Sequence, residues 1–417
     1  MREKVPGNSS EKNTSYRAMA LRWRPKTFGE IVGQEHIVST LTNAIKTNRI
    51  AHAYLFVGPR GTGKTTTARL LAMALNARNG PAVDFNPQDE ISREIAAGNC
   101  LDVIEIDGAS NNSVEQIRSL REECRYAPTS CSYKIYIIDE VHMLSNAAFN
   151  ALLKTLEEPP PHVKFIFATT EAHKVLQTIS SRCQRFSFRP ISIAMLTEKL
   201  GEIAGAEGIK SSAEALRTIA RLANGSLRDG ESILDRMIAF CGGEIDLEKI
   251  NAAYGLVDEK TIDDIISGIY YGDCKKLIKI SHKIGEQNCD LYRVLCDVEA
   301  KILEQLAAIS DGDGNYPDRM IRILGEIHKA KDSVKNGISE VINFEVALLK
   351  AAERGQSRAI DAILQDIREL RAKAAGVVPS DGVDSTPEEK ESRLAANVQS
   401  MLKDEFRAQI SVFGSGE

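Results

Sequence analysis

The sequence contains no long apolar run. No stretch approaches the eighteen or so consecutive apolar residues that a membrane-spanning helix needs, and the opening residues, MREKVPGNSSEKNTS, lack the apolar core of a signal peptide. Because no segment directs membrane insertion or export, the chain is predicted to be soluble and cytoplasmic.

Two further patterns are missing. The eight cysteines include no C-x-x-C pair, so neither a disulfide framework nor a zinc site is predicted, and reduced thiols are expected. Basic residues do not outnumber acidic ones: the chain has 53 Lys and Arg and 58 Asp and Glu, which leaves a net charge of −5. This charge argues against a basic coat for nonspecific DNA binding, although a local basic face of an assembly stays compatible with it.

The length predicts several domains. At roughly 150 residues per domain, 417 residues divide into two to four units. Hydrophobic residues make up 43% and charged residues 27%, close to the average of soluble globular proteins, so most of the chain is expected to fold.

Short apolar runs alternate with helical patterns in the first half of the chain. The runs are rich in β-branched and aromatic residues and lie at 53–58, 102–107, 134–139 and 163–170. Segments with helical spacing lie between them, at Thr65–Asn76, Val114–Cys124 and Asn146–Leu156. This alternation predicts an α/β domain with a parallel sheet covered on both faces.

After Arg189 and Pro190 the strand patterns stop and amphipathic helices follow, with glycines as stops. The predicted division is a disordered segment at 1–15, an α/β domain at 16–190, a helical lid at 191–253, a helical collar or oligomerisation domain at 254–374, a flexible linker at 375–392 and an amphipathic helix at 393–417. Apolar residues recur every four positions in this last helix. Such a stripe either folds back on the preceding domain or docks on a partner.

A phosphate-binding loop is the most specific motif. The pattern G-x-x-x-x-G-K-[ST] is matched by Gly58, Pro59, Arg60, Gly61, Thr62, Gly63, Lys64 and Thr65. It follows a predicted strand and opens a predicted helix, as its mechanism requires. Glycines let backbone N–H groups turn toward phosphate oxygens, Lys64 reaches the β- and γ-phosphates, and the Thr65 hydroxyl can bind magnesium.

Acidic and hydroxyl residues end the third and fourth predicted strands. Asp139 and Glu140 close one strand, at the sheet edge where α/β proteins place ligands. There Asp139 would hold magnesium, and Glu140 would orient and polarise the attacking water. Thr169 and Thr170 close the following strand, where a hydroxyl could sense the γ-phosphate, although threonine is also a common strand residue.

Taken together, these motifs resemble those of AAA+ ATPases, and more closely the gamma/tau subunits of the bacterial replicative clamp loader. The resemblance begins at YRAMALRWRPKTFGEIVGQEHIV, includes YKIYIIDEVHMLSNAAFNALLKTLEEPP, and ends clearly at GSLRDGESILDR. It covers about residues 16–240 and continues more faintly to about 373.

The resemblance gives roles to residues that are uninformative alone. Either Thr169 or Thr170 resembles sensor 1, Arg182 resembles the arginine finger that enters a neighbouring subunit's ATP site, and Arg228 resembles sensor 2 in the lid. Without the resemblance, a surface salt bridge would be the ordinary interpretation of either arginine. It also implies ATP with Mg²⁺. No zinc is expected, because the family's four-cysteine module is reduced to Cys100 here.

The resemblance further implies a motor that loads a sliding clamp onto primed DNA during replication. Its expected partners are delta-type and delta-prime-type subunits, copies of itself in a ring, the clamp and primed DNA, with the polymerase core as a candidate partner of the C-terminal segment. Polymerase activity would belong to the holoenzyme, because this chain shows no polymerase site. Two other functions stay open: a branch-migration helicase, which would carry a winged-helix domain after the lid, and a scaffold that has lost hydrolysis, which would be expected to break the phosphate loop.

Overall fold

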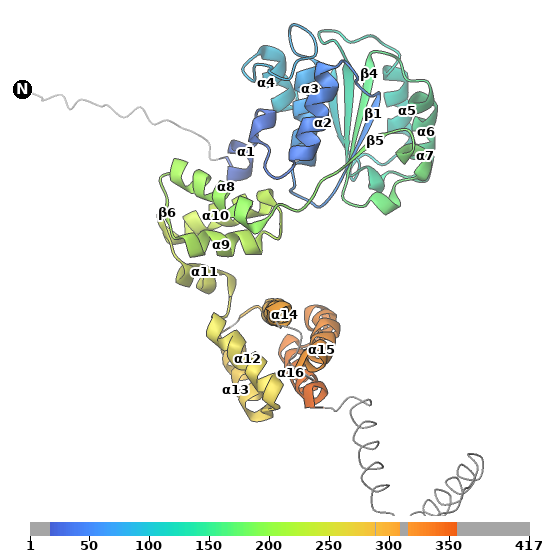
Figure 1. Ribbon diagram of the computed structural model, residues 1–417. Helices are drawn as coiled ribbons and strands as arrows, with labels where there is room; N and C mark the ends of the chain where they lie inside the picture. The colour runs from blue at the N-terminus through green and yellow to red at the C-terminus, as the bar shows by residue number, and fades with distance from the viewer. Residues whose placement is uncertain (1–16, 288, 309–315, 357–417) are drawn as a thin grey trace, which may run out of the picture.

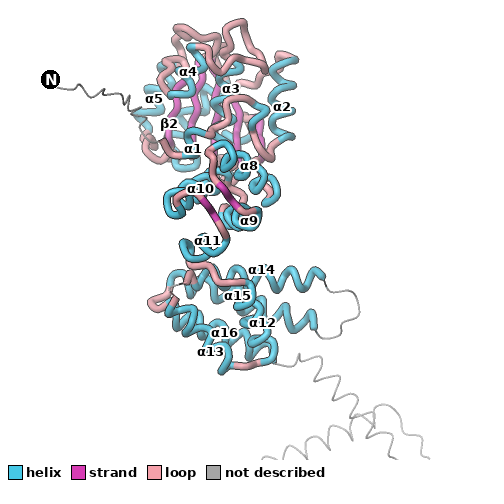
Figure 2. Tube along the Cα trace, turned by 90° about the vertical axis from the view of Figure 1, so that its left-hand side faces the viewer, coloured by secondary structure: helices cyan, strands magenta, loops and turns pink. Residues whose placement is uncertain are grey.

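The computed structural model describes residues 17–287, 289–308 and 316–356. The chain forms an α/β unit, a smaller helical unit and a third unit of helices, which succeed one another along the molecule (Figure 1; Figure 2 gives a second view). The predictions for 1–15, 375–392 and 393–417 lie outside the described residues. Among the residues described, no helix is both long and apolar enough to cross a bilayer.

A five-stranded parallel sheet forms the centre of the α/β unit. Its order is β2-β3-β4-β1-β5. The strands are β1 (Ala53–Val57), β2 (Val103–Asp107), β3 (Lys134–Asp139), β4 (Val163–Thr169) and β5 (Gln184–Ser187). Every residue of β1 and β4 is buried, which explains why these strands appear in the sequence as continuous apolar runs.

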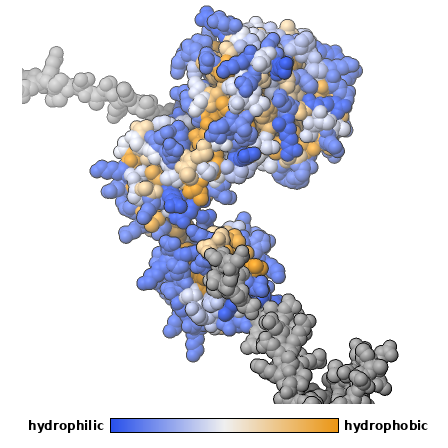
Figure 3. Space-filling view, viewed as in Figure 1, coloured by the Kyte–Doolittle hydropathy of each residue, from blue (hydrophilic) through white to orange (hydrophobic). Residues whose placement is uncertain are grey.

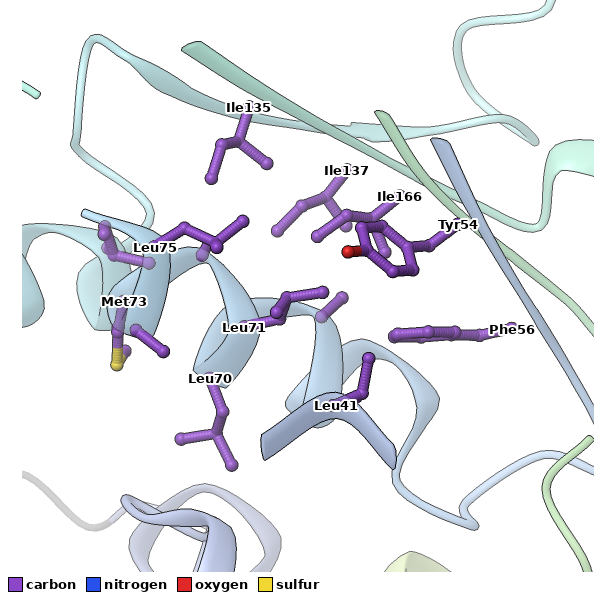
Figure 4. Close-up of a cluster of buried hydrophobic side chains, with 14 of the residues drawn as sticks. Leu41, Tyr54, Phe56, Leu70, Leu71, Met73, Leu75, Ile135, Ile137 and Ile166 are labelled. Carbon is purple, nitrogen blue, oxygen red and sulfur yellow. The ribbon is translucent and has the colours of Figure 1, made fainter. Parts of the chain in front are cut away.

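Helices cover both faces of this sheet. One face is covered by α2 (Glu35–Lys46), α3 (Lys64–Leu75) and α4 (Glu90–Ala97), and the other by α5 (Val114–Glu123), α6 (Asn146–Glu157) and α7 (Gln177–Ser180). On the first face, Leu71 of α3 lies among Tyr54, Phe56 and Ile137 of the strands (Figure 4). Short 3-10 turns complete the unit: η1 (Phe28–Glu30), η2 (Val141–Met143) and η3 (Ala172–Lys174).

The four predicted strands and three predicted helices of this unit are confirmed, but β5 was not predicted. Of its sequence QRFS only Phe186 is buried, so β5 lacks the apolar run that marks the other strands. The expectation that strands end at Pro190 is also wrong. Two-residue strands β6 (Lys210–Ser211) and β7 (Glu244–Ile245) pair in parallel within the helical unit that follows. Two residues are too few to produce a recognisable periodicity.

The second unit contains four helices and shares its core with the start of the chain. Its helices are α8 (Ile193–Ala206), α9 (Ala213–Leu222), α10 (Leu227–Cys241) and α11 (Leu247–Tyr254). Met19, in α1 (Met19–Arg22), is fully buried in the same cluster, and the Trp23 indole N–H donates to Glu207 at 2.9 Å. The predicted domain at 16–190 therefore includes a helix that packs with the lid.

Up to residue 356, the described part of the third unit contains five helices with their own apolar core. They are α12 (Glu259–Tyr271), α13 (Cys274–Glu286), α14 (Leu291–Ala308), α15 (Tyr316–Asn336) and α16 (Glu340–Gln356). Over the face seen in Figure 3, hydrophilic side chains cover most of the molecule and hydrophobic ones are scattered among them. The fold is thus an α/β domain, a helical lid and a helical C-terminal region.

Candidate nucleotide site

The predicted phosphate loop connects β1 to α3. Gly58, Gly61 and Gly63 all have positive φ, and Gly63, with φ of 99°, lies directly before the first residue of α3. A left-handed residue at this position lets the chain turn sharply from strand to helix. The first N–H groups of α3 have no acceptor within the helix, and the helix dipole places partial positive charge beside them. The loop therefore ends in an anion-binding helix terminus.

Lys64 is the charged group of this loop. Its side chain is buried, and its ammonium donates to the carbonyl oxygens of Gly58 at 2.8 Å and Pro59 at 2.9 Å. Burial lowers the pKa of Lys64, while the nearby carboxylates of Glu140 and Asp139 act in the opposite direction. A desolvated cation that is held by carbonyl groups can exchange those contacts for phosphate oxygens.

Thr65 and Asp139 meet across the site. The Thr65 hydroxyl donates to Asp139 Oδ2 at 2.6 Å, and Asp139 Oδ1 accepts from the N–H of Glu140 at 2.9 Å. Magnesium prefers oxygen ligands, usually one or two from the protein besides waters and substrate phosphates. The Thr65 hydroxyl at the start of α3 and the Asp139 carboxylate at the end of β3 fit that donor set, so these two residues would hold the ion.

Glu140 leaves the sheet in a left-handed conformation, with φ of 44° and ψ of 46°. A non-glycine residue in this region costs about 1–2 kcal/mol and often marks a functional site. Its Oε2 accepts from the N–H of Thr170 at 3.2 Å and from the hydroxyl of Thr170 at 3.0 Å. The turn thus directs the Glu140 carboxylate toward the end of the neighbouring strand β4.

Thr169 is fully buried at the end of β4 and contacts a histidine that sequence reasoning missed. His142 Nδ1 lies 3.0 Å from Thr169 Oγ1 and 3.4 Å from Glu140 Oε2, and its Nε2 lies 3.4 Å from Glu171 Oε1. The carbonyl of Thr169 also accepts from the N–H of Gly58 at 3.2 Å, which connects β4 to the phosphate loop. The only sequence signal for His142 was a polar residue between Val141 and Met143.

Arg228 approaches the phosphate loop from the lid. It is the second residue of α10, and the N–H of Leu227 before it donates to the carbonyl of Gly61 at 3.1 Å. A Cβ atom on Gly61 would lie 1.9 Å from Ser226 Oγ and 3.3 Å from Arg228 Cβ. The lid helix therefore begins in close contact with the loop, and a side chain at Gly61 would require the Ser226 hydroxyl to move.

Arg182 lies elsewhere. Its guanidinium donates to Glu157 Oε1 at 2.7 Å and to the Thr178 carbonyl at 2.7 Å, and the side chain is 35% exposed. None of these contacts involves the phosphate loop of its own chain. The structure brings together Lys64, Thr65, Asp139 and Glu140, and it leaves Arg182 apart from them.

The cysteines show one proximity that the sequence did not reveal. Cys100 Sγ lies 3.8 Å from Cys131 Sγ, because the carboxylate of Asp102 accepts N–H groups of residues 129–131 and holds that segment beside Cys100. Within residues 17–287, 289–308 and 316–356, no group of three or more His, Cys, Asp or Glu side chains is placed to hold a metal ion.

Comparisons with known proteins match two parts of the chain to families. Residues 33–192 match the family described as DNA polymerase III, delta subunit, and residues 195–243 match the family described as DNA polymerase III clamp loader subunit, ATPase lid domain. The second match covers most of the helices from α8 to α10.

Individual relatives agree with these families. DNA polymerase III subunit tau of Bacillus subtilis is 36% identical over 392 residues, which cover 87% of this chain and 70% of the relative. Subunit tau/gamma of Haemophilus influenzae is 37% identical over 351 residues, covering 81% of this chain but 51% of the relative, so the chain spans about half the length of that protein. Among solved structures, the Thermotoga maritima RuvB Holliday junction branch migration motor aligns with 60% of this chain and 79% of its own, at 19% identity and a TM-score of 0.43.

Proposed function

This chain belongs to the tau/gamma family of DNA polymerase III clamp-loader subunits, and we propose that it is the subunit that hydrolyses ATP to drive clamp loading. The observation that carries the proposal is the contact between Thr65 and Asp139, which brings the phosphate loop and the acidic strand end into one site. Lys64 and Glu140 flank this pair, so groups for binding phosphate, for holding magnesium and for activating water are present together.

The chemistry follows from these groups. Lys64 and the N–H groups at the start of α3 bind the phosphates of ATP, and magnesium, when bound, neutralises charge on the β- and γ-phosphate oxygens. Glu140 orients a water molecule and accepts its proton as the water oxygen attacks the γ-phosphorus. The bond from that phosphorus to the bridging oxygen breaks, and ADP leaves with the electron pair.

Arg182 is proposed to complete the site of a neighbouring subunit. Within its own chain its partners are Glu157 and Thr178, and 35% of the side chain is exposed. An arginine supplied by a neighbour stabilises charge in the transition state and makes hydrolysis depend on assembly. Arg228, at the start of α10, is proposed to contact the γ-phosphate from the lid.

The C-terminal helices are proposed to assemble the subunits. Several large apolar side chains on α15, on α16 and between them are exposed, namely Ile321, Ile338, Val341, Ile342 and Val346. Large apolar side chains that stay exposed on the helices of one domain are available for contact with another subunit. The proposed partners are delta-type and delta-prime-type subunits and further copies of this chain, which together engage a sliding clamp and primed DNA.

Steady-state ATP hydrolysis by the reconstituted assembly tests this function. We expect clamp and primed DNA together to stimulate hydrolysis well beyond either alone, and a Lys64→Ala assembly to show no stimulated activity. Lys46→Ala, at the exposed end of α2, is the matched lysine control. Lysine-dependent hydrolysis that is indifferent to the clamp would refute clamp loading while leaving an ATPase, and a branch-migration assay would then be the next measurement.

A further inference from the structure

His142 has a place in the site that the proposed mechanism has not used. It lies in η2, two residues after Glu140, and its side chain is 7% exposed. Both ring nitrogens face polar groups: Nδ1 faces Thr169 and Glu140, and Nε2 faces Glu171. Contacts at both nitrogens fix the rotation of the ring, whichever nitrogen carries the proton.

The ring connects the ends of two adjacent strands. Glu140 follows β3, whereas Thr169 ends β4 and Glu171 comes two residues later. The Thr169 hydroxyl oxygen also accepts from the N–H of Glu171 at 3.0 Å, so the turn after β4 is held to the same hydroxyl. A movement of the Thr169 hydroxyl is therefore passed to the His142 imidazole, and from the imidazole to the Glu140 carboxylate.

The two oxygens of the Glu140 carboxylate are in different situations. Thr170 and His142 both contact Oε2, at 3.0 Å and 3.4 Å. No residue of the described part of the chain makes a hydrogen bond to Oε1, and the side chain as a whole is 31% exposed. A carboxylate that is held through one oxygen presents the other in a fixed direction, which is what a base needs in order to orient a water molecule.

We propose that His142 is a positioning residue that sets the orientation of the Glu140 carboxylate by joining it to Thr169. The proposal rests on the proposed ATPase function, because Glu140 must act on water for its orientation to matter. His142 itself makes no contact with the phosphate loop. Its role is to transmit the position of the β4 end to the residue that activates water.

Substitutions at residue 142 separate this role from packing. An asparagine amide can occupy about the place of Nδ1 and so reach Thr169 and Glu140, whereas a glutamine amide extends toward the place of Nε2 and Glu171. We expect His142→Ala to lower kcat by about 10- to 100-fold, the cost of a misplaced catalytic group. His142→Asn should restore kcat to within about 3-fold of the wild type, and His142→Gln should stay close to His142→Ala.

The readouts are kcat of the reconstituted assembly, affinity for ATP measured by nucleotide titration, and thermal unfolding of each variant. Affinity for ATP should stay within about 2-fold throughout, because a loss confined to kcat reports on the chemical step. His173→Ala is the matched control: this ring is 76% exposed and lies 3.6 Å from Glu171 Oε2, without contact to Thr169 or Glu140. Its kcat should equal that of the wild type.

The outcomes are distinct. Unchanged kcat in His142→Ala, or His142→Asn as slow as His142→Ala despite normal unfolding, would overturn the positioning role. A parallel fall in ATP affinity and thermal stability across all three variants would assign the ring to packing and overturn it as well. Wild-type hydrolysis no faster than that of Lys64→Ala would overturn the ATPase function and this role together. Hydrolysis that ignores the clamp but follows the expected order of variants would overturn clamp loading alone.

Discussion

The N–H of Leu227, at the first residue of α10, donates a 3.1 Å hydrogen bond to the carbonyl of Gly61 in the phosphate loop. The lid and the α/β domain are thereby connected at the nucleotide site itself, through backbone atoms. We therefore expect a ligand that moves the loop to move the start of α10, and with it Arg228. Binding at the loop is thus expected to affect the orientation of the lid.

Gly61→Ala should weaken this connection. The substitution places a Cβ 1.9 Å from Ser226 Oγ at a φ of 74°, so both the backbone and the lid contact are strained. Gly80→Ala is the matched control, since Gly80 also has positive φ, of 94°, but a Cβ at that position would meet nothing within 4 Å. We expect denaturant unfolding to show a loss of about 1–2 kcal/mol for Gly80→Ala and a larger loss for Gly61→Ala. If both substitutions lower the free energy of unfolding equally, the contact between Gly61 and the lid adjusts to the added methyl group without a cost in stability.

Gly108→Ala should disturb the acidic end of β3. A Cβ there would lie 2.8 Å from the carbonyl oxygen of Glu140 and 2.9 Å from that of Asp139, so this strand end must move. We expect stability to fall by about 1–3 kcal/mol and kcat of the assembly to fall with it. Gly29→Ala, where nothing lies within 4 Å, serves as the comparison. Wild-type kcat in Gly108→Ala would show that the strand end tolerates displacement.

Complementation between two inactive chains tests the proposed role of Arg182. Arg182→Ala should keep ATP binding but lower kcat of the assembly by about 10³-fold or more, as for other arginine fingers, whereas Lys64→Ala should lose ATP binding. If the finger acts on a neighbour, mixed assemblies should regain part of the activity, because some sites pair an intact Lys64 with an intact Arg182.

The control for that experiment is Arg185→Ala, at an exposed position of β5, which should behave as the wild type. Mixtures that stay as inactive as each parent, although size-exclusion chromatography shows mixed assemblies, would argue for a site contained within one chain.

Glu231 is expected to make the stability of the lid depend on pH. Burial raises the pKa of this carboxyl to about 7, and the opposing charges of Lys199 and Arg24 offset only part of that effect. Because the folded state retains a proton that the unfolded state releases near pH 4.5, stability should fall as the pH rises from about 5 to 7, by up to about 3 kcal/mol.

Glu231→Gln should remove most of this slope and be more stable than the wild type at pH 8. Denaturant unfolding between pH 5 and 8 measures the difference, with Glu214→Gln on the exposed side of α9 as the control. If the stability of Glu231→Gln still falls with pH as steeply as that of the wild type, another group causes the pH dependence.

The parts of this site that are formed by residues close together in the sequence could be predicted from it. The phosphate loop, β1 and α3 are contiguous, and β3 and β4 are buried enough to appear as apolar runs. The contact of His142 with Thr169 could not be predicted, because it requires β3 and β4 to be neighbours in the sheet. The same holds for Cys100 and Cys131, which are adjacent only because Asp102 holds the intervening chain. The edge strand β5 escaped prediction because only Phe186 contributes to the core.

The sheet order also bears on how the protein is made. The phosphate loop follows β1, and β1 pairs with β4 and β5. It does not pair with β2 or β3, although β2 and β3 precede β4 and β5 along the chain. In the pairing of β1 with β4, the residue opposite Ala53 is Phe165. During synthesis from the N-terminus, the loop leaves the ribosome long before the strand that supports it, and such distant pairing forms late. We therefore expect a nascent chain that stops before β4 to lack the strand that supports the phosphate loop, so that the proposed nucleotide site would form only after β4 has been translated.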